Sequence, residues 1–535
     1  MAAMNGWLSF PFDDSFNHDL AIRRFCPERV EQEQGAWEWE GEWEEKLMND
    51  EFEMCSPSDT TTTPCLAASE VDDFVDSFIN MDHCDKDCNN LLDEHQNFNH
   101  FHYEIETFPR ADDVYGDVSM MIGDKLAMSD SIEDLGVVPD EIMLGVEDSN
   151  GVDQGLHLVH MLLSCAEAVG CRDTQLAESI LSQVWASANP LGTSLQRVSY
   201  CVATGLKSRL SNLHNANANG TLTNGAMGKS LITREEKAES FQLLHQATPY
   251  LAFGFMAANE AICQAAQGKD SLHIIDLGME TTLQWPSLIR SLSSRPEGPP
   301  KLRITGLISD QNQLGLEASI KALMEDASSV GITLEITMKT DPVTPSLLTR
   351  ENLNLREGEA LFVNCIMHLH EYVKESRGSL KAILQAIKKL APTAVTVVEQ
   401  DANHNGPFFL GRFLESLHYY SAIFDSLEAT LPRHSAQRMK IEMLHFAEEI
   451  RNIVAFEGSD RIERHERVDQ WRRQLGRAGF KVMGLTCMSQ ARMMLSVYGC
   501  DGYTLATEKG CLLLGWKGKP IMLASAWQVH NVLSS

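Results

Sequence analysis

The chain has 535 residues, 22% of them charged, and a formal net charge of −31 at pH 7. Residues 1–150 contain 37 acidic and 7 basic residues, so the rest of the chain is close to neutral. Contacts to nucleic-acid phosphates need a positive local field, and this balance argues against stable DNA binding by the chain alone. No window contains 18 consecutive apolar residues, so no membrane-spanning helix is predicted. The 13 scattered cysteines suit a reducing compartment.

Residues 1–150 show no sustained hydrophobic period, and their high net charge predicts a disordered segment. Within it, aromatic residues alternate with carboxylates at Trp37, Trp39, Trp43, Phe74 and Phe78. Alternation of acidic and hydrophobic residues is typical of disordered activation segments. We therefore predict an acidic, aromatic regulatory arm, with a solubilising tail as the alternative.

The same segment contains a set of residues that resembles a zinc site, namely Cys84, Cys88, His95 and His100. Only six residues separate the second cysteine from the first histidine, whereas a zinc finger of the ββα type needs about twelve. The spacing argues against metal binding, and no metal site is predicted.

Residues of about 155–267 are predicted to form a helical cap. The expected helices are one from Leu156, then Thr174–Ser187, Ser194–Leu213 and Glu235–Gln267, the last interrupted near Pro249. Their apolar faces recur at steps of three and four residues and include Leu156, Val159, Leu162, Leu163, Leu195, Val198, Val202 and Leu206. Such faces serve either an intramolecular core or a dimer interface, and the lack of a long strict heptad favours the core.

The apolar run Leu272–Asp276 predicts a buried strand of a parallel sheet, followed by a short amphipathic helix. The crevice beyond such a strand is the usual ligand site, which makes Asp276 and Gly278 vestigial candidates for cofactor binding. Glu280 and Thr282 stand where a dinucleotide or S-adenosylmethionine turn needs glycine. We therefore expect no cofactor, with Asp276 capping the next helix or fixing the loop. On the same strand, His273 is expected to be a hydrogen-bonded core residue.

The chain after this strand alternates strands and helices, which predicts an α/β fold with a Rossmann-like, doubly wound sheet over about 268–535. The expected strands are Leu302–Leu307, Thr333–Met338, Ala360–Cys365, Ala394–Val398, Lys481–Leu485, Gly502–Ala506, Leu512–Trp516 and Ile521–Ser525. The expected helices are Leu314–Ser329, Ser379–Leu390, Pro407–Leu431, Gln437–Phe456 and Arg467–Gly476. The antiparallel finish is similar to the layout of Rossmann-like methyltransferases.

Several motifs, in order, resemble the plant GRAS family of transcriptional regulators. Leu272, His273, Ile274, Ile275 and Asp276 look like the VHIID signature, and leucine-rich regions expected to be helical flank it near 156–213 and 314–350. Further matches are Pro407, Phe408, Arg412 and Glu415 for the PFYRE region; Arg461, Glu463 and Arg464 for RVER; Trp471 for a tryptophan helix; and Ser525, Ala526 and Trp527 for SAW.

The resemblance implies that residues 151–535 form a GRAS domain of a nuclear transcriptional co-regulator. Family members act through contacts with DNA-binding transcription factors, zinc-finger proteins among them, and with other GRAS proteins as homo- or heterodimers. They reach DNA indirectly, and no membrane contact is implied. The resemblance assigns partner contacts to the first leucine-rich region and to Leu272–Asp276. No DELLA or VHYNP tract is present, which argues against recognition by the gibberellin receptor.

Two alternatives stay open: a methyltransferase that uses S-adenosylmethionine in the crevice beyond Asp276, and a non-enzymatic small-molecule sensor. Against the first, the strand Leu302–Leu307 does not end on the acidic residue that would hold a ribose, since Asp310 comes three residues late.

Two groups of charged residues have structural interpretations. Arg412 and Glu415, three apart on one helix, either pair with each other or bridge to another element, and the bridge is our preferred interpretation. The arginine-rich stretch 461–477 also contains acids, which predicts a salt-bridged surface. Trp516 and Trp527 are expected to close the sheet edge and the core.

Overall fold

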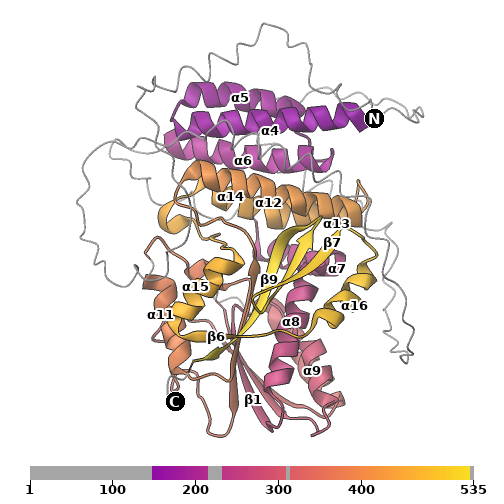
Figure 1. The fold of residues 1–535 in the computed structure, drawn as a ribbon, viewed down its shortest axis with the longest axis vertical. Helices are drawn as coiled ribbons and strands as arrows, with labels where there is room; N and C mark the ends of the chain where they lie inside the picture. The colour runs from indigo at the N-terminus through magenta and orange to yellow at the C-terminus, as the bar shows by residue number, and fades with distance from the viewer. Residues whose placement is uncertain (1–147, 215–231, 309–313, 377, 531–535) are drawn as a thin grey trace, which may run out of the picture. The chain divides into compact units, whose positions relative to one another are not determined.

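The computed structural model describes residues 148–214, 232–308, 314–376 and 378–530, all within one compact unit (Figure 1). The aromatic residues of the predicted regulatory arm and the Cys84–His100 group lie outside the described residues. In the part of the chain that the structure describes, every helix is too short or too polar to cross a membrane.

Five helices come first, close to the predicted bounds. They are α4 (Asp148–Gly170), α5 (Thr174–Ser187), α6 (Ser194–His214), α7 (Arg234–Ala247) and α8 (Pro249–Ala265). The first helix begins eight residues earlier than the apolar pattern indicates, because its first turns are polar. The interruption at Pro249 is confirmed: the proline occupies the first turn of α8, where its missing N–H costs no helical hydrogen bond.

All the predicted strands are present in one nine-stranded sheet. They are β1 (Ser271–Leu277), β2 (Lys301–Leu307), β3 (Thr333–Lys339), β4 (Ala360–Ile366), β5 (Ala394–Gln400), β6 (Phe480–Met483), β7 (Tyr503–Glu508), β8 (Cys511–Trp516) and β9 (Lys519–Val529). The order is β3-β2-β1-β4-β5-β9-β8-β7, with β6 also paired to β9. Strands β1 to β5 are parallel, and β9 runs antiparallel to β5, β6 and β8. The Rossmann-like fold with an antiparallel finish is confirmed.

The remaining elements follow the predicted alternation, with three differences. They are α9 (Trp285–Ser293), α10 (Leu314–Ser329), η2 (Leu369–Tyr372), α11 (Gly378–Lys389), α12 (Phe409–Thr430), α13 (Ala436–Ile441), η3 (Glu442–Phe446), α14 (Ala447–Ala455), η4 (Gly458–Asp460), α15 (Val468–Ala478) and α16 (Met488–Tyr498). The predicted continuous helix Gln437–Phe456 contains a π turn at η3. Helix α16 was not predicted because it buries only Ala491 and so has little apolar periodicity. The family resemblance implies that the second leucine-rich region is helical throughout, but it consists of the predicted helix to Ser329 followed by the predicted strand.

Alternate residues of the central strand pack into hydrophobic cores on opposite faces of the sheet. Ile274 packs into a cluster with residues of α8, α9 and α10, whereas Ile275 packs into a cluster with residues of α11 and α15. A strand buried on both faces is mostly apolar, which is why the segment Leu272–Ile275 lacks the alternation of a half-exposed strand.

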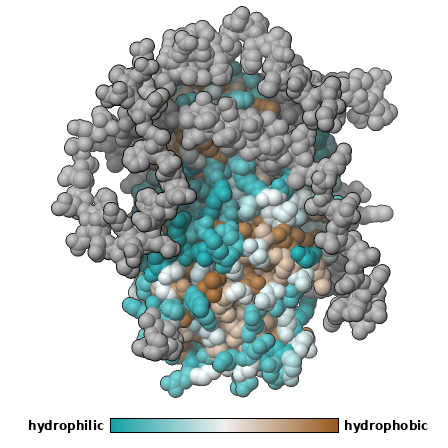
Figure 2. All heavy atoms as spheres, in the orientation of Figure 1, coloured by the Kyte–Doolittle hydropathy of each residue, from teal (hydrophilic) through white to brown (hydrophobic). Residues whose placement is uncertain are grey.

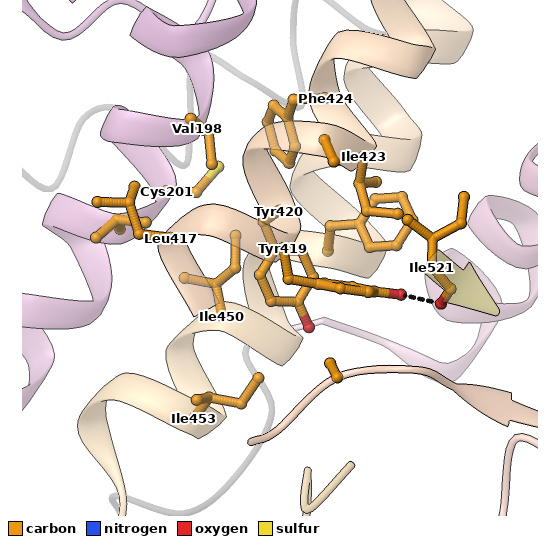
Figure 3. Packing of buried hydrophobic residues seen from close by; sticks show 14 of the residues in the cluster. Val198, Cys201, Leu417, Tyr419, Tyr420, Ile423, Phe424, Ile450, Ile453 and Ile521 are labelled. Atoms are coloured by element: carbon orange, nitrogen blue, oxygen red, sulfur yellow. Dashed lines mark hydrogen bonds between the residues drawn. The ribbon is translucent and has the colours of Figure 1, made fainter. Parts of the chain in front are cut away.

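The first three helices lie beside α12 and α14, which separate them from the sheet (Figure 1). Figure 3 shows this junction: Val198 and Cys201 of α6 face Leu417 of α12 and Ile450 of α14. The hydroxyl of Tyr419 donates to the carbonyl oxygen of Ile521 in β9 at 2.9 Å. One continuous core therefore joins the leucine-rich helices to the sheet.

Candidate functional site

The crevice beyond β1 is filled by the chain's own side chains. Gly278 adopts φ +94°, and a Cβ built on it would lie 2.5 Å from Cγ of His368, which follows β4. His368 is itself buried, and its Nε2 lies 2.7 Å from the hydroxyl of Tyr372. The glycine is therefore needed for close approach to an imidazole of this chain.

The end of β2 is covered in the same way. A Cβ on Gly306 would lie 2.7 Å from the sulfur atoms of both Met279 and Met338. Met279 is fully buried and belongs to the core that α9 closes. Thioether side chains pack well into irregular gaps. Here they occupy the space at the end of β2, where a nucleotide-binding protein of this fold would hold the ribose.

The Asp276 side chain points into a buried amide network. Its carboxylate accepts a hydrogen bond from Asn364 at 3.3 Å, and Asn364 also donates to Gln284 at 2.9 Å. Thr396 and Asn259 complete the network. Burial raises the pKa of Asp276 to about 7, although the bond from Asn364 lowers it. Of the two roles predicted for Asp276, helix capping is wrong, because α9 has Gln284 at its N-cap and no side-chain cap. Asp276 is instead linked through Asn364 to Gln284, at the end of the loop that precedes α9.

His273 is a hydrogen-bonded core residue, as predicted. Its Nε2 lies 2.8 Å from the Thr305 hydroxyl and its Nδ1 lies 2.9 Å from the guanidinium of Arg303. Arg303 is held in turn by Glu359. Burial, with Arg303 beside it, lowers the pKa of His273 to about 4, so the ring is neutral at physiological pH.

These residues do not fit S-adenosylmethionine. A cofactor turn needs small residues where Glu280 and Thr282 stand, and the approach to β1 is occupied by His368 and Met279. We derive no catalytic step at this crevice.

Gly278→Ala is expected to lower the free energy of unfolding by about 2–5 kcal/mol. A positive φ disfavours alanine by about 1–2 kcal/mol, and the clash with the His368 ring adds overpacking strain of about 1–3 kcal/mol. Gly268→Ala is the matched control, since φ is +68° there and nothing lies within 4 Å of the new Cβ. Urea unfolding of both variants measures the difference. Equal losses would show that the crevice has room beside Gly278.

A second buried polar cluster lies next to the crevice, where β4 and β5 end. His370 Nδ1 donates to Glu399 Oε2 at 2.7 Å, and Glu399 Oε1 also accepts the backbone N–H of Leu369 at 2.7 Å. His370 Nε2 lies 3.2 Å from Glu463, which precedes α15. Among the described residues, His370, Glu463 and His465 are the one set of three such side chains close enough to hold a metal ion.

The PFYRE residues bridge separate elements. Arg412 of α12 pairs with Glu457 at 2.5 Å, and Glu457 also pairs with Arg209 of α6 at 3.0 Å. Glu415 pairs with Arg467 at 2.7 Å, next to the start of α15. Arg412 and Glu415 therefore bond to other elements and not to each other. Together they connect the cap, α12 and the segment before α15.

The prediction of a salt-bridged surface is wrong for the first two arginines of the stretch 461–477. Arg461 and Arg464 are buried, and their guanidinium groups donate mainly to backbone carbonyl oxygens. Arg461 donates to His404 at 2.9 Å, and Arg464 donates to Gly458 at 2.8 Å. Burial, with Arg412 nearby, lowers the pKa of Arg461 to about 9. These side chains fix loop backbone and are not available to a nucleic acid.

The tryptophans of the last motifs are core residues. Trp471 is buried in the cluster beneath α11 and α15, and Trp527 of β9 belongs to the same cluster. The indole N–H of Trp527 donates to Ser525 at 2.9 Å, and that of Trp516 donates to Asp425 at 2.6 Å. Ala526 pairs in register with Thr396 of β5. The SAW residues thus lie where the antiparallel finish meets the parallel sheet.

The motifs also match a known family over most of the chain. The sequence profile described as the GRAS domain family matches residues 158–528. The chain belongs to the GRAS family.

Among its relatives, the GRAS family protein RAD1 of Lotus japonicus is 43% identical over 72% of this chain and 77% of the relative. The DELLA protein RGL1 of Arabidopsis thaliana is 37% identical over 71% of each. The crystal structure of SCL7 in Oryza sativa superposes with a TM-score of 0.62 at 29% identity, over 69% of this chain and 99% of that one. These relatives make the chain a plant regulatory protein of development or symbiosis.

Most of the partner-binding residues that the resemblance implies are buried in the structure. Three are partly buried, namely Leu156, Leu163 and Leu195. The others are buried, namely Val159, Leu162, Val198, Val202, Leu206, Leu272, His273, Ile274, Ile275 and Asp276. Partner contacts in this region would therefore use the outer faces of the helices, and the leucine faces would support those helices from within.

Sequence reasoning missed the ion pairs that join the cap to the core. Arg197 of α6 is fully buried and binds Glu442 of η3 through both carboxylate oxygens at 3.0 Å. It also binds Glu428 of α12 at 2.9 Å. The one available signal was a lone arginine on the apolar face of a predicted helix, between Leu195 and Val198.

Proposed function

We propose that the chain is a nuclear transcriptional co-regulator that acts through protein contacts and not through catalysis. The observation that supports this most is the filled crevice: His368 and Met279 take the positions from which a doubly wound sheet usually binds its cofactor. A protein of this fold that lacks the cofactor site can still act through its surface and through its N-terminal segment, by binding other proteins.

The proposed partners are DNA-binding transcription factors, zinc-finger proteins among them, and other GRAS proteins. Near neutrality of residues 151–535 and the acidity of residues 1–150 favour indirect contact with DNA. Figure 2 shows hydrophobic residues at the surface over the middle of one face, between more hydrophilic regions. On α16, Met493 and Val497 are 71% and 77% exposed at a spacing of four residues. Exposed apolar side chains on one helix face are the kind of surface that a protein partner covers.

We further propose that residues 1–150 form the activating arm. Its aromatic residues are held in solution by neighbouring carboxylates until a partner groove accepts them. Activation would then depend on the aromatic side chains more than on the net charge.

A tethered reporter assay in plant cells tests this function. The full chain fused to a foreign DNA-binding domain is expected to activate a reporter by at least several fold. Replacing Trp37, Trp39, Trp43, Phe74 and Phe78 by alanine is expected to abolish that activation, because the hydrophobic contacts are lost while the net charge stays the same.

The matched control replaces five acids of the same segment by their amides, which removes charge and keeps the aromatics. It should retain activation. Activation that survives the aromatic replacement and falls with the amides would contradict an aromatic contact, and an inactive wild-type chain would contradict co-activation.

A further inference from the structure

Three side chains of types that bind metal ions converge beyond the carboxyl ends of β4 and β5, next to the crevice beyond β1. His370 belongs to η2 after β4, and Glu463 and His465 lie in the loop between η4 and α15. One ligand atom from each lies within 4.8 Å of the others. His370 Nε2 is 3.2 Å and His465 Nε2 is 3.4 Å from the same oxygen, Oε2 of Glu463. Two imidazoles thus point their outer nitrogen atoms at one carboxylate.

The spacing of these three atoms also matches that of ligands around a tetrahedral ion. Zinc–ligand bonds of about 2.0–2.1 Å place neighbouring ligand atoms about 3.3–3.4 Å apart. Charge-assisted hydrogen bonds are shorter, at about 2.7–2.9 Å, and His370 makes one of that length to Glu399 at 2.7 Å. The two distances to Glu463 are longer than this and close to the edge of a metal tetrahedron.

The second nitrogen of each imidazole is held in place by a residue behind it. Glu399 accepts from His370 Nδ1 and is itself fixed by the backbone N–H groups of Leu369 and His370. His465 Nδ1 lies 2.9 Å from Nδ1 of His404, which stacks on Tyr420. Metal-binding histidines typically have such partners on their other nitrogen, because these fix the tautomer and the ring orientation.

One nitrogen in the cluster has no hydrogen-bond partner. His465 is fully buried, and no hydrogen bond satisfies its Nε2. This nitrogen faces Oε2 of Glu463 at 3.4 Å, and an unpaired, buried imidazole nitrogen beside a carboxylate is a candidate metal ligand.

We propose that His370, Glu463 and His465 form a zinc-binding site that ties the segment after β4 to the segment before α15. The three side chains supply three of the four ligands of a tetrahedral ion. Imidazole and carboxylate together suit zinc better than they suit magnesium or calcium, which prefer oxygen ligands alone. The site goes beyond the proposed function because it does not depend on which partner the protein binds.

A proton is the alternative occupant. Although burial opposes it, Glu399 and Glu463 raise the pKa of His370 well above its usual value, so an imidazolium would also bridge these carboxylates. That arrangement leaves His465 Nε2 without a role.

The test uses the full chain, stripped with a chelator and then titrated with zinc against a chromophoric competitor. We expect one zinc ion per chain. Glu463→Gln preserves the shape of a partly exposed side chain and should weaken binding at least about 10-fold, as should His465→Ala. Circular dichroism identifies a variant that fails to fold. Of the two variants, Glu463→Gln is expected to disturb folding less, because it keeps the size and shape of the side chain.

Two controls separate this site from other sources of zinc. His434→Ala changes an exposed histidine and should bind as the wild-type chain does. Cys84→Ser with Cys88→Ser removes the other set of zinc-like residues and should also leave binding unchanged. The proposal is overturned if the stripped chain binds no zinc, if Glu463→Gln binds as tightly as wild type, or if the cysteine variant alone loses the ion.

Discussion

Arg197→Ala is expected to lower the free energy of unfolding by about 3–5 kcal/mol. The guanidinium group is completely buried between α6, α12 and η3, and it binds Glu442, Glu428 and two backbone carbonyl oxygens. Removal leaves the carboxylate of Glu442 buried with only Arg438, at 3.5 Å, beside it. Urea unfolding of the full chain measures the loss, and α6 should lose its attachment to the core first.

The loss should also depend on pH. Burial already raises the pKa of Glu442 to about 7 in the intact protein, although Arg197 lowers it. Without Arg197 the folded-state pKa rises further above the unfolded value. A carboxyl group of this kind adds stability that is present at low pH and lost as pH rises through the folded pKa. The difference between variant and wild type should therefore be larger at pH 8 than at pH 6.

Arg356→Ala is the matched control for Arg197. Arg356 pairs with Glu335 at 2.7 Å, but both side chains are about half exposed, and such pairs contribute about 0–1 kcal/mol. The variant Arg197→Met with Glu442→Leu should recover part of the stability, since it replaces two buried charges with apolar groups. A loss at Arg197 no larger than at Arg356 would contradict the view that this ion pair joins the cap to the core.

Trp471→Ala is expected to lower the free energy of unfolding by about 3–5 kcal/mol, because it empties a buried site between α15 and the sheet. Its indole N–H has no hydrogen-bond partner, so the ring matters here for its volume. Trp471→Phe should therefore cost much less, since it keeps an aromatic ring and removes an unpaired donor.

Thermal and urea unfolding of both variants test this packing role. Arg473→Ala on the exposed side of α15 is the control and should stay within about 0.5 kcal/mol of wild type. Trp471→Ala that unfolds like wild type and yet loses transcriptional activity would indicate a contact residue, and would contradict the core assignment.

Much of the fold could be predicted from local patterns. Leu272, Ile274 and Ile275 show no alternation with exposed residues because both faces of β1 are covered. Pro249 divides two helices because it lacks an N–H. The family motifs also follow chain order, so the Rossmann-like architecture and the family were both accessible. Helix α16 was not, because a helix that buries one residue leaves no apolar stripe to detect.

The candidate site was harder to predict because its contacts join residues far apart in sequence. The sequence around Arg197 does not reveal that its side chain binds Glu442. The sequence around Gly278 does not reveal that the His368 ring lies where a side chain at position 278 would be. Arg461 and Arg464 were misjudged for a related reason. Charged residues in a mixed stretch are usually exposed, whereas here the backbone of Gly458 and His404 satisfies them inside the protein.

If side chains of the domain fill the cofactor crevice, the full chain should not bind labelled S-adenosylmethionine. Equilibrium dialysis should give no saturable binding up to millimolar ligand, while an S-adenosylmethionine-dependent methyltransferase in the same assay binds. Saturable binding of one ligand per chain, weakened by Glu280 or Asp276 replacements, would contradict the account and favour an enzyme or a sensor.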